Sequence, residues 1–213
     1  MNKALVFDCD STLSSIEGID ELARLAGPET FRQVEDLTNQ AMNGDFPLDE
    51  VFSRRLALIQ PDKAMCEKVA QLYRDTVEPT AKETIAAFQK KGWDCVLLSG
   101  GFKVLIEPLA ADLGISRIEA VPLHFQGDGS YQSFDNSYPT TYNGGKPEII
   151  RQLRKEKGYE TIVMIGDGVS DLETKPDVEA FVAYAGYVSR EKVISGATHT
   201  IHQLDQLNSL ALD

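Results

Sequence analysis

The sequence contains few cysteines. Its 213 residues include only Cys9, Cys66 and Cys95. An odd and widely spaced set does not form the disulfide framework of a small secreted domain, and these positions lack the spacing of zinc ligands. We therefore expect a cytoplasmic protein without disulfides or structural zinc.

Positive charge is also scarce. The chain has 21 Lys and Arg against 33 Asp and Glu, a formal net charge of -12, and its basic residues form no cluster. Such a chain repels nucleic acid and anionic membrane surfaces. We expect a small molecule as the partner, with no nucleic acid and no membrane. A monomer and a homodimer both stay open.

Long hydrophobic runs are missing as well. The first apolar run, residues 4–7, ends at Asp8, far short of a signal-peptide core or a membrane span. With 42% hydrophobic and 25% charged residues, the composition is typical of an ordinary globular protein.

What the sequence does contain is an alternation of strands and helices. The apolar segments 4–7, 93–98, 161–165 and 180–184 predict strands, and helical patterns around 81–91, 102–113 and 145–157 lie between them. This order is typical of an α/β fold with a parallel sheet.

The first two of these strands are too far apart for a simple crossover, which takes roughly 30 residues in all. Ile19, Leu22, Ala23 and Ala26 repeat with helical spacing in the intervening stretch. We predict a helical cap at residues 15–75, inserted into a core formed by residues 1–14 and 76–213.

Two local patterns predict further structure. Thr80-x-x-Glu83 has the form of a capping box at the start of a helix. Segments 121–126 and 130–134 are joined by Gly127-Asp128-Gly129, which predicts a hairpin, here interpreted as a solvent-exposed flap.

The first chemical motif is Asp8-Cys9-Asp10-Ser11-Thr12, directly after the first strand. In extended chain Asp8 and Asp10 point to the same side. Two carboxylates ~4 Å apart repel by about 4 kcal/mol at an effective dielectric of 20, and a divalent cation relieves this repulsion. The alternative is a polar turn that caps a helix.

The second motif, at residues 166–171, follows the strand 161–165. It resembles a dinucleotide fingerprint, but Asp171 replaces the final glycine and would oppose a pyrophosphate. Asp167 and Asp171 instead suit Mg²⁺, which binds carboxylate oxygens. A plain Asp-Gly turn is the alternative.

Two further signals suit a phosphate group. Ser99-Gly100-Gly101 offers a hydroxyl and backbone N–H groups, and Lys146 offers a positive charge near a helix start. Neither is specific alone. Lys146 does not belong to a Walker loop, because Thr140 and Pro147 occupy positions that require Gly and Ser or Thr.

In this order the four signals resemble the haloacid dehalogenase phosphatase superfamily. The likeness extends to members that hydrolyse O-phospho-L-serine, through Glu17-Gly18-Ile19-Asp20, the segment that begins Arg55-Leu56-Ala57, and Phe102 after the Gly-Gly pair. The resemblance implies a Rossmann-like core with a helical cap. It also implies Mg²⁺-dependent release of L-serine and phosphate through an aspartyl-phosphate, the last step of L-serine biosynthesis.

The resemblance also implies roles for the core residues. Asp8 would be the nucleophile and Asp10 the acid and base. Mg²⁺ would be held by Asp8, the Asp10 main-chain carbonyl and Asp167, with Asp171 behind them. The phosphate cradle would consist of Lys146, Ser99 and Gly100.

Substrate choice is expected to depend on the cap. The family pattern assigns Glu17 to the substrate ammonium and Arg55 to its carboxylate, and it places Met42 near the substrate. Ser170 is a further expected contact. Two positions depart from the family: Asn43 stands where glycine is common, and Leu48 replaces the usual aromatic residue.

Three alternatives stay open at this point. The first is the same chemistry on another small phosphomonoester. The second is a glycosyltransferase that uses Asp8 and Asp10 to hold a metal, which leaves Asp167, Asp171 and Lys146 unexplained. The third is a binding module whose aspartate is merely phosphorylated, which the cap and Asp10 argue against.

Overall fold

The computed structural model describes residues 2–42 and 48–212, except for the side chains of residues 39–42, 48 and 49. The expected α/β fold with a parallel sheet is confirmed. Six parallel strands are ordered β3-β2-β1-β6-β7-β8. They are β1 (Lys3–Phe7), β2 (Trp93–Phe102), β3 (Arg117–Val121), β6 (Thr161–Gly166), β7 (Ala180–Tyr184) and β8 (His199–Ile201).

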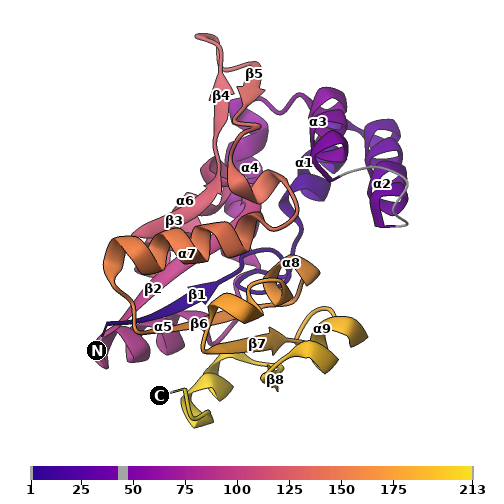
Figure 1. Cartoon of the computed structure of the whole chain (residues 1–213). Coiled ribbons are helices and arrows are strands. Elements are labelled where there is room, and N and C mark those ends of the chain that lie inside the picture. The colour runs from indigo at the N-terminus through magenta and orange to yellow at the C-terminus, as the bar shows by residue number, and fades with distance from the viewer. Residues whose placement is uncertain (1, 43–47, 213) are drawn as a thin grey trace.

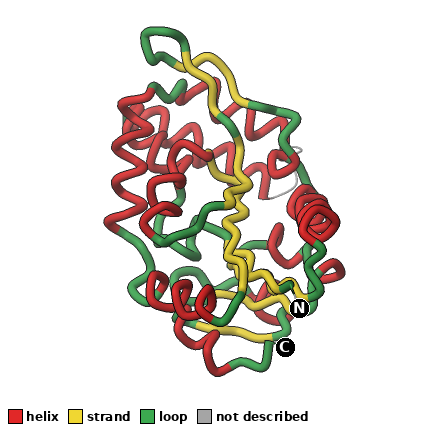
Figure 2. Tube along the Cα trace, turned by 90° about the vertical axis from the view of Figure 1, so that its left-hand side faces the viewer, coloured by secondary structure: helices red, strands yellow, loops and turns green. Residues whose placement is uncertain are grey.

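Helices cover both faces of this sheet, which Figure 2 shows nearly edge-on. In β1, Leu5 and Phe7 belong to the core on one face, whereas Ala4 and Val6 belong to the core on the other. Because both faces are covered, the strand is apolar without alternation. The first face packs against α5 (Ala81–Lys90) and α6 (Lys103–Asp112), and the second against α7 (Gly145–Lys157).

Four helices lie between β1 and α5 in the chain. They are α1 (Gly18–Ala26), α2 (Pro28–Met42), α3 (Leu48–Ile59) and α4 (Lys63–Asp75). Figure 1 shows α1, α2 and α3 to one side of the sheet, whereas α4 packs against α6 of the core. Within the described part of the chain, no helix is long and apolar enough to cross a membrane.

The predicted hairpin is present as β4 (Leu123–Phe125) and β5 (Tyr131–Phe134). It is not a simple solvent-exposed flap, however. The Phe134 ring lies 5.3 Å from the Phe52 ring of α3, and the Lys63 amide at the start of α4 donates to the Gly129 carbonyl at 3.0 Å. The hairpin therefore packs on the inserted helices, as its position in Figure 1 shows.

The sequence-based prediction differs from the structure at four other places. The short strands β3 and β8 at the two edges of the sheet were not predicted, and β2 continues through the Gly-Gly pair to Phe102. The capping box is wrong, because the Thr80 hydroxyl donates to the Glu78 carboxylate at 2.8 Å instead of capping α5. The nearby buried carboxylate competes successfully for this hydroxyl.

This Glu78 carboxylate joins two distant segments. It is 2% exposed and accepts from the Thr80 amide at 2.7 Å and from the Leu204 amide at 3.2 Å. In Glu78→Gln the new NH₂ group faces donors, so we expect the free energy of unfolding to fall by about 1–3 kcal/mol. Urea unfolding measures this. The exposed control Glu83→Gln is expected to change it by less than about 0.5 kcal/mol, and an equal effect of both would contradict the assignment.

The order of the strands fixes where a ligand binds. From β1 the chain proceeds through β2 to β3 on one side, then returns through α7 to β6, β7 and β8 on the other side. The direction reverses between β1 and β6, which pair from Lys3 with Thr161 to Phe7 with Ile165. In open α/β sheets ligands bind beyond the carboxyl ends of strands at such a switch point.

Candidate active site

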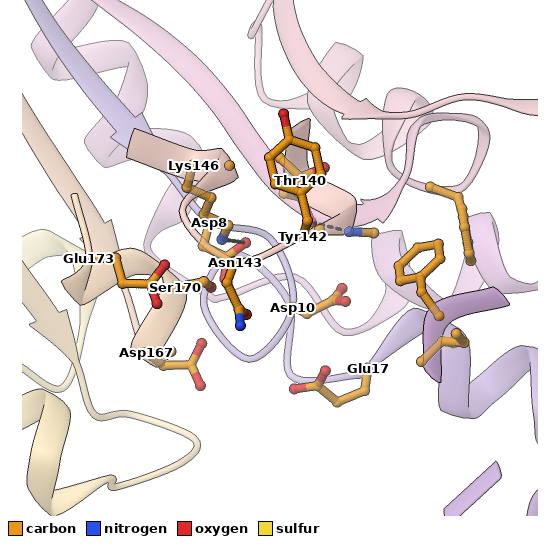
Figure 3. A pocket seen from close by; sticks show the side chains of 18 of the residues that line it. Asp8, Asp10, Glu17, Thr140, Tyr142, Asn143, Lys146, Asp167, Ser170 and Glu173 are labelled. Atoms are coloured by element: carbon orange, nitrogen blue, oxygen red, sulfur yellow. Dashed lines mark hydrogen bonds and ion pairs between the residues drawn. The ribbon is translucent and has the colours of Figure 1, made fainter. Parts of the chain in front are cut away.

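A cavity of about 250 Å³ lies at this switch point, between the sheet and the inserted helices. Figure 3 shows its lining side chains. The structure brings together nine of the eleven expected site residues as lining residues: Asp8, Asp10, Glu17, Arg55, Ser99, Gly100, Lys146, Asp167 and Ser170. The cavity therefore combines groups from both the sheet and the inserted helices.

Three carboxylates meet beneath the cavity. Asp8 after β1, and Asp167 and Asp171 after β6, each place an oxygen atom within 4.8 Å of the others, and all three are buried. Lys146 Nζ lies 3.0 Å from Asp8 Oδ1 and 2.6 Å from Asp171 Oδ1. Fully ionised, the three carboxylates outnumber the two cations that contact them, Lys146 and Arg190. Such a set of carboxylate oxygens has the chemistry of a divalent cation site.

The turn after β6 holds Asp171 close to the backbone. Its Oδ2 accepts from the Gly168 amide at 2.9 Å. A Cβ atom at position 166 would lie 2.3 Å from the Asp171 carboxyl carbon, so only glycine fits there. Asp171 accepts from the Gly168 amide with one oxygen and from Lys146 Nζ with the other, so it holds the Lys146 ammonium group in place.

Burial changes the acidity of these groups. Burial and the neighbouring Asp8 raise the pKa of Asp167 to about 7. For Lys146, burial would lower the pKa, but Asp171 and Asp8 outweigh it and raise the pKa above its ordinary value. The lysine therefore stays charged, whereas Asp167 is only partly ionised near neutral pH in the absence of a cation.

Asp10 has a different environment from Asp8. Ser11 adopts a left-handed backbone conformation, with φ of 51°, and turns the chain after Asp10. Asp10 accepts a hydrogen bond from the Tyr73 hydroxyl. Burial, followed by the carboxylates of Glu17 and Asp8, raises the pKa of Asp10 well above its ordinary value. A carboxyl in this state can donate a proton near neutral pH.

The Ser99-Gly100-Gly101 segment lies at the end of β2 rather than at a helix start. The pairing of β2 with β3 shifts register between Leu98 and Phe102, which indicates a bulge. The Gly101 amide donates to Ser99 Oγ at 2.9 Å. The bulge therefore turns Ser99 and Gly100 toward the cavity instead of continuing the ladder.

Arg55 and Arg54 have different surroundings on α3. Arg54 pairs with Glu50 at 2.6 Å on the exposed side. Arg55 lines the cavity, where its Nη1 lies 3.4 Å from Thr38 Oγ1 and its buried Nε has no hydrogen-bond partner among the side chains that the structure describes. A buried guanidinium nitrogen without an acceptor is costly, so this geometry favours a bound anion.

Glu17 also lines the cavity and lies just before α1. Its carboxylate accepts from Ser11 Oγ at 2.7 Å, and burial raises its pKa. Ser170, near the start of the short helix α8 (Val169–Leu172), also lines the cavity. Met42 is the last residue of α2, but its side chain and that of Leu48 lie outside the described part, as does Asn43.

Thr140 and Arg190 are among the cavity residues that the sequence did not predict. Thr140 is 8% exposed, and its hydroxyl joins Arg55 Nε as the second buried side-chain atom without a partner among the described residues. Arg190 Nη1 lies 2.7 Å from Asp167 Oδ2, and Thr12 Oγ1 lies 3.2 Å from Asp167 Oδ1. No sequence pattern marks Thr140 or Arg190, since only the tertiary fold brings them to the site.

Comparisons with known proteins show the family of the chain. The model of the haloacid dehalogenase-like hydrolases matches residues 5–174. A phosphoserine phosphatase of Mus musculus is 37% identical over 196 residues, or 91% of this chain and 86% of the relative. A chloroplastic phosphoserine phosphatase of Arabidopsis thaliana is 38% identical over 213 residues, or 98% of this chain and 72% of the relative.

Solved structures show the same architecture. A phosphoserine phosphohydrolase-like protein of Francisella tularensis has a TM-score of 0.83 at 28% identity, with 98% of this chain and 99% of that chain covered. A phospho-aspartyl intermediate analogue of phosphoserine phosphatase has a TM-score of 0.80 at 25% identity, covering 99% and 100%. The chain therefore belongs to the haloacid dehalogenase-like hydrolase family, whose members it matches across both the sheet and the inserted helices.

Proposed function

We propose that this chain is a Mg²⁺-dependent phosphatase that hydrolyses O-phospho-L-serine to L-serine and phosphate, the last step of L-serine biosynthesis. One observation carries the substrate assignment. The cavity that contains Asp8 and Lys146 also contains Arg55, whose buried Nε lacks a hydrogen-bond partner within the described part of the chain. The relatives named phosphoserine phosphatase support the same assignment.

The charges in the cavity favour an amino-acid phosphate over other phosphomonoesters. Glu17 can accept from a substrate ammonium, and Arg55 can donate to a carboxylate. A sugar phosphate would leave both charges unpaired in a closed site, which is costly. Ser170 and the buried hydroxyl of Thr140, which has no partner among the described residues, would add polar contacts.

The chemistry follows from the positions of the two aspartates. An Asp8 carboxylate oxygen attacks phosphorus, and the bond from phosphorus to the serine oxygen breaks as that oxygen takes the proton of Asp10. Asp10 then accepts a proton from a water molecule, which attacks the aspartyl-phosphate and releases phosphate. Lys146, Ser99 and Gly100 hold the phosphoryl oxygens during both steps.

The carboxylates beneath the cavity fit a magnesium ion. Asp8 and Asp167 would bind it together with the Asp10 main-chain carbonyl, and Asp171 would support them. When bound, the cation would offset negative charge on the transferring phosphoryl group. A glycosyltransferase is disfavoured, because Lys146 bridges Asp8 and Asp171 in a way that a nucleotide-sugar metal does not require.

The inserted helices would act as a cap. We assign residues 15–75 to the cap and residues 1–14 and 76–213 to the catalytic core. Glu17 and Arg55 come from the cap side of the cavity, whereas the acidic cluster comes from the core. Substrate recognition and phosphoryl transfer are therefore divided between the two parts.

The test is phosphate release from O-phospho-L-serine, p-nitrophenyl phosphate and several sugar phosphates, each with Mg²⁺ and with EDTA. We expect the highest kcat/KM for O-phospho-L-serine and no turnover in EDTA. Equal kcat/KM for all substrates would contradict the substrate assignment. Undiminished activity in EDTA would contradict the role of the cation.

The acidity of Asp167 predicts how the cation affects stability. Because its pKa of about 7 lies above the ordinary aspartate value, the metal-free folded chain holds an extra proton below that pH. Binding this proton stabilises the metal-free folded chain relative to the unfolded chain, and that stabilisation is lost as the pH rises through the folded pKa of Asp167. Mg²⁺ must displace the proton, so its binding weakens as the pH falls.

We therefore expect Mg²⁺ to raise the Tm more at about pH 8 than at about pH 6. Thermal unfolding with and without Mg²⁺ at both pH values measures the difference. In Asp167→Asn the effect of Mg²⁺ is expected to shrink at both. A larger rise at the lower pH in the unaltered chain would contradict the prediction.

A further inference from the structure

A tyrosine outside the cavity contacts the proposed acid and base. Tyr73 lies in the last part of α4 and is fully buried, and its hydroxyl donates to Asp10 Oδ1. It is not among the described residues that line the cavity. Any effect of Tyr73 on the reaction therefore passes through Asp10.

The packing fixes the position of this hydroxyl. A Cβ atom on Gly18 would lie 2.2 Å from the Tyr73 hydroxyl oxygen, so the hydroxyl occupies the space that a side chain at that position would fill. A Cβ atom on Gly101 would lie 3.8 Å from the same oxygen. The hydroxyl is thus enclosed between the start of α1 and the end of β2, with little freedom to leave Asp10.

This contact distinguishes the two oxygens of Asp10. A tyrosine hydroxyl is protonated at neutral pH and donates its hydrogen to Oδ1. In the protonated carboxyl group the acidic hydrogen is therefore left to Oδ2. Oδ2 faces Gly101, since a Cβ atom there would lie 3.6 Å from it, and Gly101 lines the cavity beside Ser99.

We infer that Tyr73 is a positioning residue that orients the Asp10 carboxyl group, so that Oδ2 presents its proton to the leaving oxygen of the substrate. This inference rests on the proposed phosphatase function. It adds a residue of the inserted helices to the proton transfer, at a position 63 residues beyond Asp10 in the chain.

The role has a kinetic signature that a purely structural residue lacks. A serine alkoxide is a strong base and leaves only if a proton is delivered to it, whereas p-nitrophenolate is a weak base and leaves without much help. Because kcat/KM includes every step through departure of the leaving group, it reports this proton delivery. Losing the orientation of Asp10 should therefore affect the two substrates unequally.

The experiment compares Tyr73→Phe with the unaltered chain. We expect kcat/KM for O-phospho-L-serine to fall about 10–100-fold, part of the effect of a general acid, and that for p-nitrophenyl phosphate to fall less than about threefold. Tyr159→Phe is the matched control, because it removes a similar bond, from the Tyr159 hydroxyl to Asp94 Oδ2 at 2.7 Å, away from the cavity. It should leave the ratio of the two kcat/KM values unchanged.

A second variant tests the same contact if Tyr73→Phe does not fold. Gly18→Ala keeps the tyrosine but displaces its hydroxyl. Like Tyr73→Phe, it should therefore lower the ratio of kcat/KM for O-phospho-L-serine to kcat/KM for p-nitrophenyl phosphate. Circular dichroism checks that each variant is folded. An equal loss for both substrates, or no loss, in the folded variants would overturn the inference.

A wrong substrate assignment would give a different result from a wrong role for Tyr73. An unaltered chain that hydrolyses p-nitrophenyl phosphate but not O-phospho-L-serine would contradict the substrate assignment, and the comparison would then use an alkyl phosphate that the chain accepts. A chain that hydrolyses no phosphomonoester would overturn both the proposed function and the role of Tyr73.

Discussion

Asp8→Asn is expected to abolish phosphate release, with kcat reduced about 10⁴-fold or more, as is typical when a nucleophile is removed. The amide has nearly the same shape as the carboxylate, but its oxygen is a poor nucleophile toward phosphorus. Asp8 lies at the centre of the site, 3.0 Å from Lys146 Nζ and within 4.8 Å of the carboxylates of Asp167 and Asp171. Phosphate release under saturating substrate and Mg²⁺ measures the loss.

Two controls make this result specific. Asp205→Asn makes the same change on the exposed surface and should retain full activity. Far-ultraviolet circular dichroism should be unchanged in Asp8→Asn, because the substitution adds no volume to the core. Full activity in folded Asp8→Asn would contradict the mechanism.

Arg55→Ala is expected to change substrate preference rather than chemistry. A hydrogen bond to a charged group contributes about 1.5–3 kcal/mol, so KM for O-phospho-L-serine should rise about 10–100-fold. p-Nitrophenyl phosphate has no carboxylate, and its KM should change less than about threefold. Steady-state kinetics on both substrates measures the split.

The adjacent arginine supplies the control for this experiment. Arg54 pairs with Glu50 on the exposed side of α3, so Arg54→Ala should leave both KM values unchanged. If Arg55→Ala raised the two KM values equally, the arginine would hold the phosphate or the fold rather than the carboxylate. An unchanged KM for O-phospho-L-serine would remove Arg55 from the substrate site.

The parts of the site that could be predicted from sequence are those that follow apolar strands. Strand β1 is buried on both faces, so its sequence is apolar until it ends at Asp8, and the same holds for β6 before Asp167. Because parallel strands end at the same edge, their carboxylates converge whatever the intervening chain does. The fold and the acidic cluster were therefore accessible from local pattern.

The contacts that could not be predicted depend on tertiary packing. Tyr73 lies at a helical position that is equally consistent with a simple core residue, and only the packing of α4 against α6 brings it to Asp10. Arg190 reaches Asp167 from a loop before α9 (Glu191–Gly196). The edge strands β3 and β8 were missed because they are short and only partly buried, so neither forms a long apolar run.

The central claim is that Asp8 takes the phosphoryl group from O-phospho-L-serine. Its most direct test is acid quenching of the chain within milliseconds of mixing with O-phospho-L-serine and Mg²⁺, followed by mass spectrometry of the peptides. The account predicts a phosphoryl group on Asp8, absent from Asp8→Asn. A phosphoryl group on another residue, or turnover of O-phospho-L-serine with no modified Asp8 at any time, would contradict it.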